Sequence, residues 1–274
     1  MKAANPWYPV ISYATLGGVM GYAKVRRERI SAAQGRSKGG RLPDFVVIGT
    51  QKGGTSFFYR LLRKHPLVRP AATKELHFFD RNKVFDKGVE WYRRCFPESA
   101  RVDGQRTVTG ESSPSYLFSA QAPARMAEVI PDAKLVALLR NPIDRAYSHY
   151  QMQVRRGAEE RSFEEATEEE MDTGGSPPYL ARGFYAEQLQ RFSFFADRGQ
   201  LLVVKSENLF TRRLEVLHRV LRFLELPPFE PTVARRAGSG TYEPMEPATK
   251  RRLEEFYAPH NERLYDLLGS DFGW

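Results

Sequence analysis

Cysteine is nearly absent from this chain of 274 residues, in which Cys95 is the only one. A single thiol excludes an intramolecular disulfide framework and a cysteine-based zinc cluster. Long apolar runs are scarce, and a mean hydropathy of −0.52 argues against a polytopic membrane protein. No internal repeat is visible. Hydrophobic residues still make up 41% and aromatics 12%, which is enough for a buried core and excludes a disordered, collagen-like or coiled-coil chain.

Positive charge is concentrated at the N-terminal end. The net charge is +9, and residues 1–44 hold eight Lys and Arg side chains against two acidic ones. This distribution indicates a basic arm and linker over residues 1–41, followed by a single domain over 42–274. It does not favour a nucleic-acid-binding surface spread over the whole protein, and we expect no nucleic-acid partner.

The arm contains an apolar but glycine-rich stretch between Trp7 and Ala23. It is short for a bilayer span of about 20 residues and lacks the features of a signal peptide. Three interpretations stay open, namely packing or mobility beside the domain, peripheral contact with a membrane or partner, and a true anchor. With a single cysteine and no convincing signal peptide, we expect a cytoplasmic protein that can associate with a membrane through this segment.

Short apolar runs alternate with helical patterns from Asp44 onward. Strands are predicted over 45–49, 135–139 and 201–204, and helices over 55–64, 144–154 and near 162–172, 183–196, 211–224 and 248–267. This alternation predicts an α/β fold, a P-loop-like single domain with a central parallel sheet flanked by helices. Ligands of such folds bind beyond the carboxyl ends of the strands, here from Gly49 and from Arg140 onward. The acidic run over 159–172 is interpreted as a solvated helix face.

The most informative stretch follows the first predicted strand and contains Gln51, Lys52, Gly53, Gly54, Thr55 and Ser56. Backbone N–H groups of a glycine-rich turn and of a helix N-terminus favour an anion, and Lys52 adds a full charge. The stretch is not a Walker A loop, because Thr55 stands where that motif requires lysine after the glycines. A turn that merely packs a helix on a strand is the alternative.

A second candidate anion site follows the strand predicted at 135–139. Arg140 leaves its carboxyl end, and Ser148 lies one turn after Asp144 on the next predicted helix. A guanidinium and a hydroxyl together suit a terminal phosphate. The alternative is a salt bridge between Arg140 and Asp144 with Ser148 on the surface.

Together these segments resemble the PAPS-dependent sulfotransferases, above all the carbohydrate branch of heparan sulfate N- and 3-O-sulfotransferases and its bacterial relatives. The resemblance covers about 44–274 and includes the segments KELHFFD at 74–80 and GESSPSY at 110–116. It implies that residues 51–56 bind the 5′-phosphosulfate of 3′-phosphoadenylyl sulfate (PAPS), while Arg140 and Ser148 bind its 3′-phosphate. It also implies a late loop that closes over the cofactor and contains Gly238, Ser239, Gly240, Thr241 and Tyr242. That loop has no basic residue, unlike the animal enzymes, and no disulfide hairpin precedes it.

The same resemblance makes Lys52, Glu75 and His77 the candidate catalytic residues. Lys52 would stabilise charge on the leaving oxygen, Glu75 would take the acceptor's proton, and His77 would support Glu75 or bind the acceptor. We expect no metal requirement, because lysine and the helix dipole neutralise the leaving group. In an extended stretch, positions 75 and 77 point to the same side. The alternatives are an ion pair of Glu75 with Lys74 and a packed His77 beside Phe78.

The predicted function is therefore transfer of a sulfuryl group from PAPS to a hydroxyl or amine. A glycan acceptor is implied by the family branch, whereas a lipid or a small natural product stays open. Two competing functions are a P-loop kinase or NTPase and a non-enzymatic polyanion-binding protein that uses the basic arm.

Overall fold

The structure is a computed structural model that describes residues 40–231 and 243–274. Seven strands are present in this part of the chain: β1 Phe45–Gly49, β2 Val68–Pro70, β3 Arg101–Val102, β4 Gln105–Arg106, β5 Val108–Ser112, β6 Lys134–Leu139 and β7 Leu201–Lys205. The longer helices are α2 Thr55–Leu62, α5 Ala122–Val129, α6 Pro142–Arg155, α7 Phe163–Thr173, α11 Arg213–Phe223 and α12 Pro247–Leu268. The short ones are α3 Asn82–Phe85, α4 Val89–Arg94, η2 Ala181–Gly183, α8 Tyr185–Gln190, α9 Ser193–Ala196 and α10 Asn208–Thr211.

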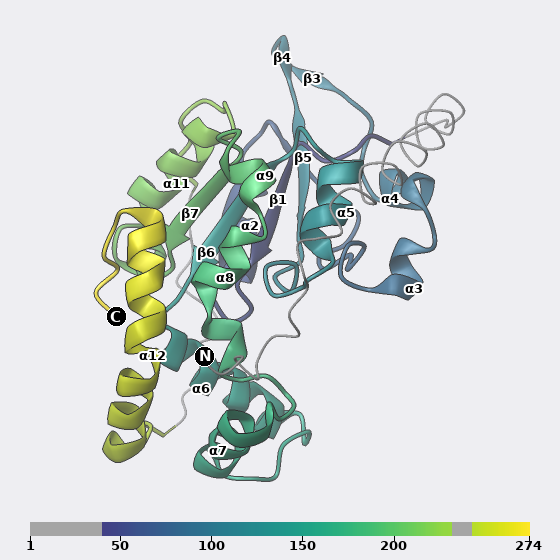
Figure 1. Ribbon diagram of the computed structural model, residues 1–274. Helices are drawn as coiled ribbons and strands as arrows, with labels where there is room; N and C mark the ends of the chain where they lie inside the picture. Colours follow the sequence, from purple (N-terminus) through teal and green to yellow (C-terminus); the bar gives the residue numbers. More distant parts are fainter. Residues whose placement is uncertain (1–39, 232–242) are drawn as a thin grey trace.

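Five strands form one central sheet in the order β2-β5-β1-β6-β7, and every neighbouring pair is parallel. Phe45 of β1 pairs with Gly110 of β5 on one side and with Lys134 of β6 on the other. The hairpin of β3 and β4 projects from the end of the molecule opposite α7 (Figure 1). Helices cover both faces of the sheet, which confirms the predicted α/β architecture with a central parallel sheet.

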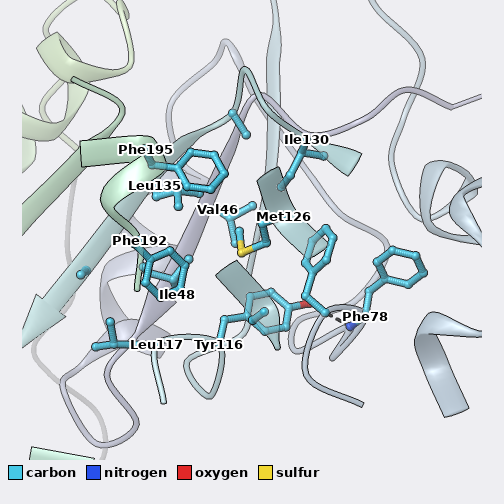
Figure 2. Packing of buried hydrophobic residues seen from close by; sticks show 14 of the residues in the cluster. Val46, Ile48, Phe78, Tyr116, Leu117, Met126, Ile130, Leu135, Phe192 and Phe195 are labelled. Atoms are coloured by element: carbon cyan, nitrogen blue, oxygen red, sulfur yellow. Dashed lines mark hydrogen bonds between the residues drawn. The ribbon is translucent and has the colours of Figure 1, made fainter. Parts of the chain in front are cut away.

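Two apolar cores lie on opposite faces of this sheet, because side chains alternate along each strand. Val46 and Ile48 of β1 pack with Met126 of α5 and Phe192, and Figure 2 shows this cluster. Phe45 and Val47 face the other way, toward the core formed with α2 and α11. Each fully buried side chain of this kind stabilises the fold by about 1.5–3 kcal/mol. The burial of both faces explains why β1 reads as an unbroken apolar run.

Two features of the fold differ from the sequence prediction. Strand β5, with the sequence VTGES, and the short β2 were not predicted, because their polar residues hide the strand pattern. The helix predicted near 183–196 is divided into η2, α8 and α9. The helix predicted near 211–224 likewise begins with the separate turn α10.

The acidic run at 159–172 is only partly a solvated face. Glu170 is 1% exposed and accepts hydrogen bonds from the backbone N–H groups of Leu180 and Ala181. Glu159 is also buried, against Arg161 and the Tyr179 hydroxyl. These two carboxylates therefore hold the segment that leads to η2, a role that helical periodicity does not reveal.

None of the helices in residues 40–231 and 243–274 is long and apolar enough to span a bilayer.

Candidate active site

The glycine-rich turn joins β1 to α2 at the carboxyl edge of the sheet. Lys52 and Gly54 both have left-handed backbone conformations, with φ of 70° and 82°. The turn is fixed by its neighbours, since the Thr50 N–H donates to the Leu138 carbonyl at 2.7 Å and the Ser206 hydroxyl donates to the Gly53 carbonyl at 2.7 Å. Strand β6 and the residue that follows β7 thus hold the turn against the strand ends.

Glycine is required at position 53 by close packing. A Cβ atom there would lie 2.7 Å from the carbonyl oxygen of Leu138, closer than real side chains come. In the part of the chain that the structure describes, no side chain caps the N-terminus of α2. The first-turn N–H groups therefore lack an intrahelical or capping partner, which is the usual setting of an anion site.

A cleft of about 840 Å³ opens above this turn. Nine of the predicted site residues line it: Gln51, Lys52, Gly54, Thr55, Ser56, Glu75, His77, Arg140 and Ser148. Gly53 is buried beneath the turn and is absent from the lining. The predicted late-loop residues Gly238, Ser239, Gly240, Thr241 and Tyr242 lie outside the described residues. The tertiary structure thus brings together three sequence segments, 51–56, 75–77 and 140–148, that are far apart in the chain.

The cleft is strongly cationic. Its lining contains seven Lys and Arg side chains, and Glu75 and Asp80 are the carboxylates among the lining residues. Burial lowers the pKa of Lys52, and the positive charges of Arg155, Arg140 and Arg156 lower it further. This crowding of like charge favours a ligand with more than one negative group.

The Arg140 side chain contacts the glycine-rich turn and not the helix α6 that follows it. Its Nη1 donates to the Lys52 carbonyl at 3.2 Å, and its own carbonyl accepts from the Tyr185 hydroxyl at 2.8 Å. No ion pair joins Arg140 to Asp144, so the salt-bridge alternative is wrong for these two described residues. Ser148 is only 7% exposed, yet it lines the cleft from α6, which excludes the alternative of a surface serine.

The segment with Glu75 and His77 is not extended, contrary to the prediction. Both residues have left-handed φ values, 62° and 53°. The Glu75 N–H donates to the Ser112 carbonyl at 3.1 Å, and the His77 N–H donates to the Ser113 hydroxyl at 3.2 Å. Hydrogen bonds to the end of β5 therefore impose a conformation that the local sequence does not favour.

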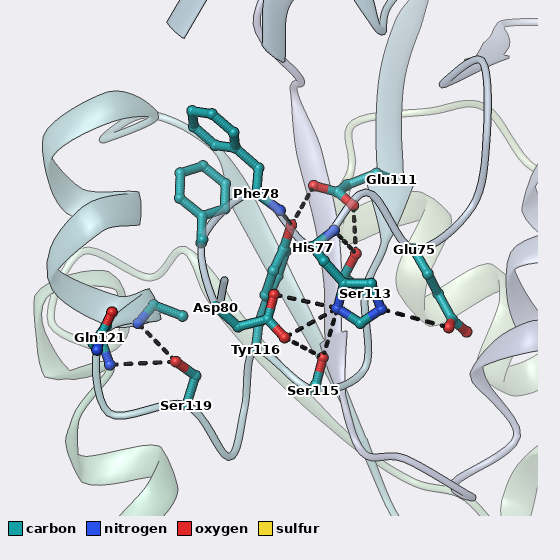
Figure 3. Close-up of polar contacts among 12 residues, drawn as sticks. Glu75, His77, Phe78, Asp80, Glu111, Ser113, Ser115, Tyr116, Ser119 and Gln121 are labelled. Carbon is teal, nitrogen blue, oxygen red and sulfur yellow. Dashed lines mark hydrogen bonds and ion pairs between the residues drawn. The ribbon is translucent and has the colours of Figure 1, made fainter. Parts of the chain in front are cut away.

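His77 lies between two carboxylates (Figure 3). Its Nδ1 is 3.0 Å from Asp80 Oδ2, and its Nε2 is 3.8 Å from Glu75 Oε2. The Ser115 hydroxyl donates to the same Asp80 oxygen at 2.6 Å. Asp80, and then Glu75, raise the pKa of His77 to about 9. With this pKa the ring carries a proton at neutral pH, and its contacts with two carboxylates go beyond simple packing beside Phe78.

Glu75 also pairs with Lys74, as the alternative interpretation proposed, but this pair coexists with the contact to His77. His77 first, and then Lys74, lower the pKa of Glu75 to about 2. The carboxylate is ionised at neutral pH and 45% of its side chain is exposed, so it is accessible from the cleft. An ionised carboxylate of this kind can accept a proton.

Sequence reasoning missed several lining residues. Asp80 orients His77, and its signal was present as a carboxylate three residues after the histidine. Arg155 and Arg156 at the end of α6 and the largely buried Arg182 add positive charge, but arginines at a helix end have no distinctive pattern. Over residues 40–231 and 243–274 there is no cluster of three or more His, Cys, Asp or Glu side chains that could hold a metal ion.

Residues 42–245 match the sulfotransferase domain family. The chain is 33% identical over 261 residues to heparan sulfate glucosamine 3-O-sulfotransferase 3B1 of Homo sapiens, with coverage of 85% of this chain and 65% of that protein. It is 33% identical to the human 3-O-sulfotransferase 6, covering 85% of this chain and 74% of the relative. The chain thus spans less than two thirds of the length of the 3B1 relative.

A crystal structure of a sulfotransferase from Alicyclobacillus acidocaldarius is similar over 85% of this chain and 98% of that one. The TM-score is 0.71 and the sequence identity 32%. Sequence and fold agree, and the chain belongs to the sulfotransferase domain family.

Proposed function

We propose that this protein transfers a sulfuryl group from PAPS to a hydroxyl or amine of a glycan. One observation supports the proposal: a cationic cleft is lined by two separate segments that could bind anions and by an accessible carboxylate. The donor has negative charge at both its 5′-phosphosulfate and its 3′-phosphate, which matches two such segments. An acceptor must lose a proton, which matches the carboxylate.

In this proposal the groups that bind the donor come from the glycine-rich turn, from the residue that follows β6 and from α6. Lys52 and the N–H groups at the start of α2 bind the 5′-phosphosulfate, and the hydroxyls of Thr55 and Ser56 add hydrogen-bond donors. Arg140 and Ser148 bind the 3′-phosphate. When bound, the donor presents an electrophilic sulfur whose bond to the bridging phosphate oxygen breaks as the acceptor attacks. Lys52 and the α2 dipole then stabilise the negative charge on the leaving phosphate.

Glu75 is the proposed base. It takes the proton from the acceptor hydroxyl or amine as the new bond to sulfur forms, and the proton ends on its carboxyl group. His77, kept charged by Asp80, holds Glu75 in place and stabilises its ionised form. Positioning and charge stabilisation thus carry the reaction, as in phosphoryl transfer.

The proposed class of acceptor is supported by the positive charge of the cleft and by the similarity of the chain to two human enzymes. Arg155, Arg156 and Arg182 exceed what the donor's two anionic ends require and favour an acidic glycan chain. The two human relatives are named for 3-O-sulfation of glucosamine in heparan sulfate, which supports a hydroxyl of that sugar as the attacking group.

Three experiments test this proposal. Adenosine 3′,5′-bisphosphate should raise the melting temperature without magnesium, whereas stabilisation only by ATP with magnesium would instead support a kinase. Transfer of radiolabelled sulfate from PAPS should occur to N-sulfated heparan chains and not to a neutral glycan, a sterol or a phenol. Absence of both binding and transfer would refute the proposal. Removal of residues 1–41 should leave nucleotide binding intact, which a polyanion-binding arm does not predict.

A further inference from the structure

A fully buried carboxyl group lies behind the segment with Glu75 and His77. Glu111, on β5, is 0% exposed. The hydroxyls of Tyr92 and Tyr116 donate to its Oε1 at 2.7 and 2.9 Å, and the Ser113 hydroxyl donates to its Oε2 at 2.7 Å. Burial raises the pKa of Glu111, while these hydrogen bonds oppose that shift. Such a group is costly to bury, and Glu111 is not among the residues that line the cleft.

Two of these hydroxyls continue to the backbone of the segment that carries the proposed base (Figure 3). The Ser113 oxygen accepts from the His77 N–H at 3.2 Å, and the Tyr116 oxygen accepts from the Phe78 N–H at 2.9 Å. Two consecutive amides, those of His77 and Phe78, are thus linked to one carboxyl group through its hydroxyl partners.

The direction of the hydrogen bonds made by Ser113 and Tyr116 requires that residue 111 accept a hydrogen bond from each of them. A hydroxyl has one proton, and the Ser113 and Tyr116 oxygens each already accept an amide N–H. Each must therefore donate its proton onward, and a carboxylate is the side chain that only accepts. An amide at position 111 would place an NH₂ group against at least one of these hydroxyls, whose own proton would then have no acceptor at position 111.

We propose that Glu111 is a positioning residue for the sulfuryl transfer: through Ser113 and Tyr116 it holds the backbone of residues 75–78, left-handed at Glu75 and His77, in the conformation that places these two side chains at the cleft. This inference rests on the proposed function. The left-handed φ values of Glu75 and His77 cost free energy, which the relay from β5 offsets. Glu111 touches neither donor nor acceptor and acts through the segment alone.

Tyr92 provides a matched control. Its hydroxyl also donates to Oε1 of Glu111, but it has no hydrogen bond to the segment in the described chain. Tyr92→Phe and Tyr116→Phe each delete one buried hydroxyl from the same oxygen and keep the ring. Their rings pack on Phe78 and Phe79, respectively, and those contacts survive both substitutions. A structural role alone predicts equal effects, whereas a positioning role predicts that they differ.

The experiment compares Tyr116→Phe, Ser113→Ala and Tyr92→Phe with the wild type. We expect kcat to fall by about tenfold or more for the first two and by less than about threefold for Tyr92→Phe, with the affinity for adenosine 3′,5′-bisphosphate unchanged in all three. Glu111→Gln should lose at least as much as Tyr116→Phe. If Glu111→Gln does not fold, the comparison of Tyr116→Phe and Ser113→Ala with Tyr92→Phe still decides the question.

A second readout is independent of activity. NMR titration of His77, whose pKa is raised to about 9 by Asp80 and Glu75, should show the pKa moving toward 6.5 in Tyr116→Phe and Ser113→Ala but not in Tyr92→Phe. Equal kcat and equal His77 titration in Tyr116→Phe and Tyr92→Phe would overturn the positioning role. If the wild type transfers no sulfuryl group, the proposed function fails, while the titration still decides whether Glu111 controls this segment.

Discussion

Replacing Asp80 by Asn should flatten the pH dependence of stability on the alkaline side. The change keeps the size of the side chain and its acceptor oxygen for Ser115, and it removes the negative charge 3.0 Å from His77 Nδ1. Asp80 is the largest cause of the raised pKa of His77, and Glu75 is the next. In Asp80→Asn the pKa of His77 should therefore return most of the way from about 9 toward 6.5.

The sign follows from proton binding. Between pH 6.5 and about 9 the native protein keeps a proton on His77 that the unfolded chain has lost. Stability from this group is complete below pH 6.5 and is lost as pH rises through about 9, with a slope of about 1.4 kcal/mol per pH unit. The integrated loss is about 3 kcal/mol at most, and 16% and 11% exposure of the two side chains leaves little solvent screening.

The assay is the urea denaturation of both proteins from about pH 6 to about pH 10. The difference between the two curves cancels the titration of Lys52 and Cys95, whose pKa values burial also shifts. We expect the wild type to lose about 2 kcal/mol more than Asp80→Asn over this range. Parallel curves, or a wild-type His77 that titrates near 6.5 by NMR, would refute the reasoning.

Four further substitutions test the site. Lys52→Ala should abolish transfer while the melting temperature stays near that of the wild type, because the side chain faces the cleft. Glu75→Gln should also abolish turnover but keep nucleotide binding, measured by calorimetry. Arg140→Ala should raise the Kd for adenosine 3′,5′-bisphosphate more than it lowers kcat. Gly53→Ala should weaken both binding and stability, by about 1–3 kcal/mol in chemical denaturation, since its Cβ would meet the Leu138 carbonyl.

Contrary outcomes are equally specific. Wild-type turnover in Glu75→Gln would remove Glu75 as the base, and unchanged nucleotide affinity in Arg140→Ala would remove Arg140 from the donor site. A Lys52→Ala protein that still transfers sulfate would leave the α2 N-terminus as the principal stabiliser of the leaving group. If Gly53→Ala kept full stability, the turn would be able to accommodate a Cβ atom beside the Leu138 carbonyl, and close packing would not require glycine at position 53.

The sheet could be predicted from sequence only where both faces of a strand are buried. β1, β6 and β7 read as apolar runs, and their predicted positions are confirmed within a residue. β5 escaped prediction because Glu111 breaks the apolar pattern, and its burial depends on the hydroxyls of Tyr92, Ser113 and Tyr116. Such partners come from other parts of the chain, so no local window reveals them.

By itself the sequence determined which residues could bind anions and the order in which they follow their strands. One predicted strand is followed by a lysine, two glycines and two hydroxyl residues, and another is followed by an arginine. These residue types are candidates for binding an anion, and that conclusion does not depend on the rest of the fold. Tertiary structure alone decided the backbone of Glu75 and His77, the partnership of His77 with Asp80, and the place of Arg140 against Lys52 rather than Asp144. Those features depend on hydrogen bonds between segments that are distant in the chain, and such bonds outweigh local preferences of about 1–3 kcal/mol.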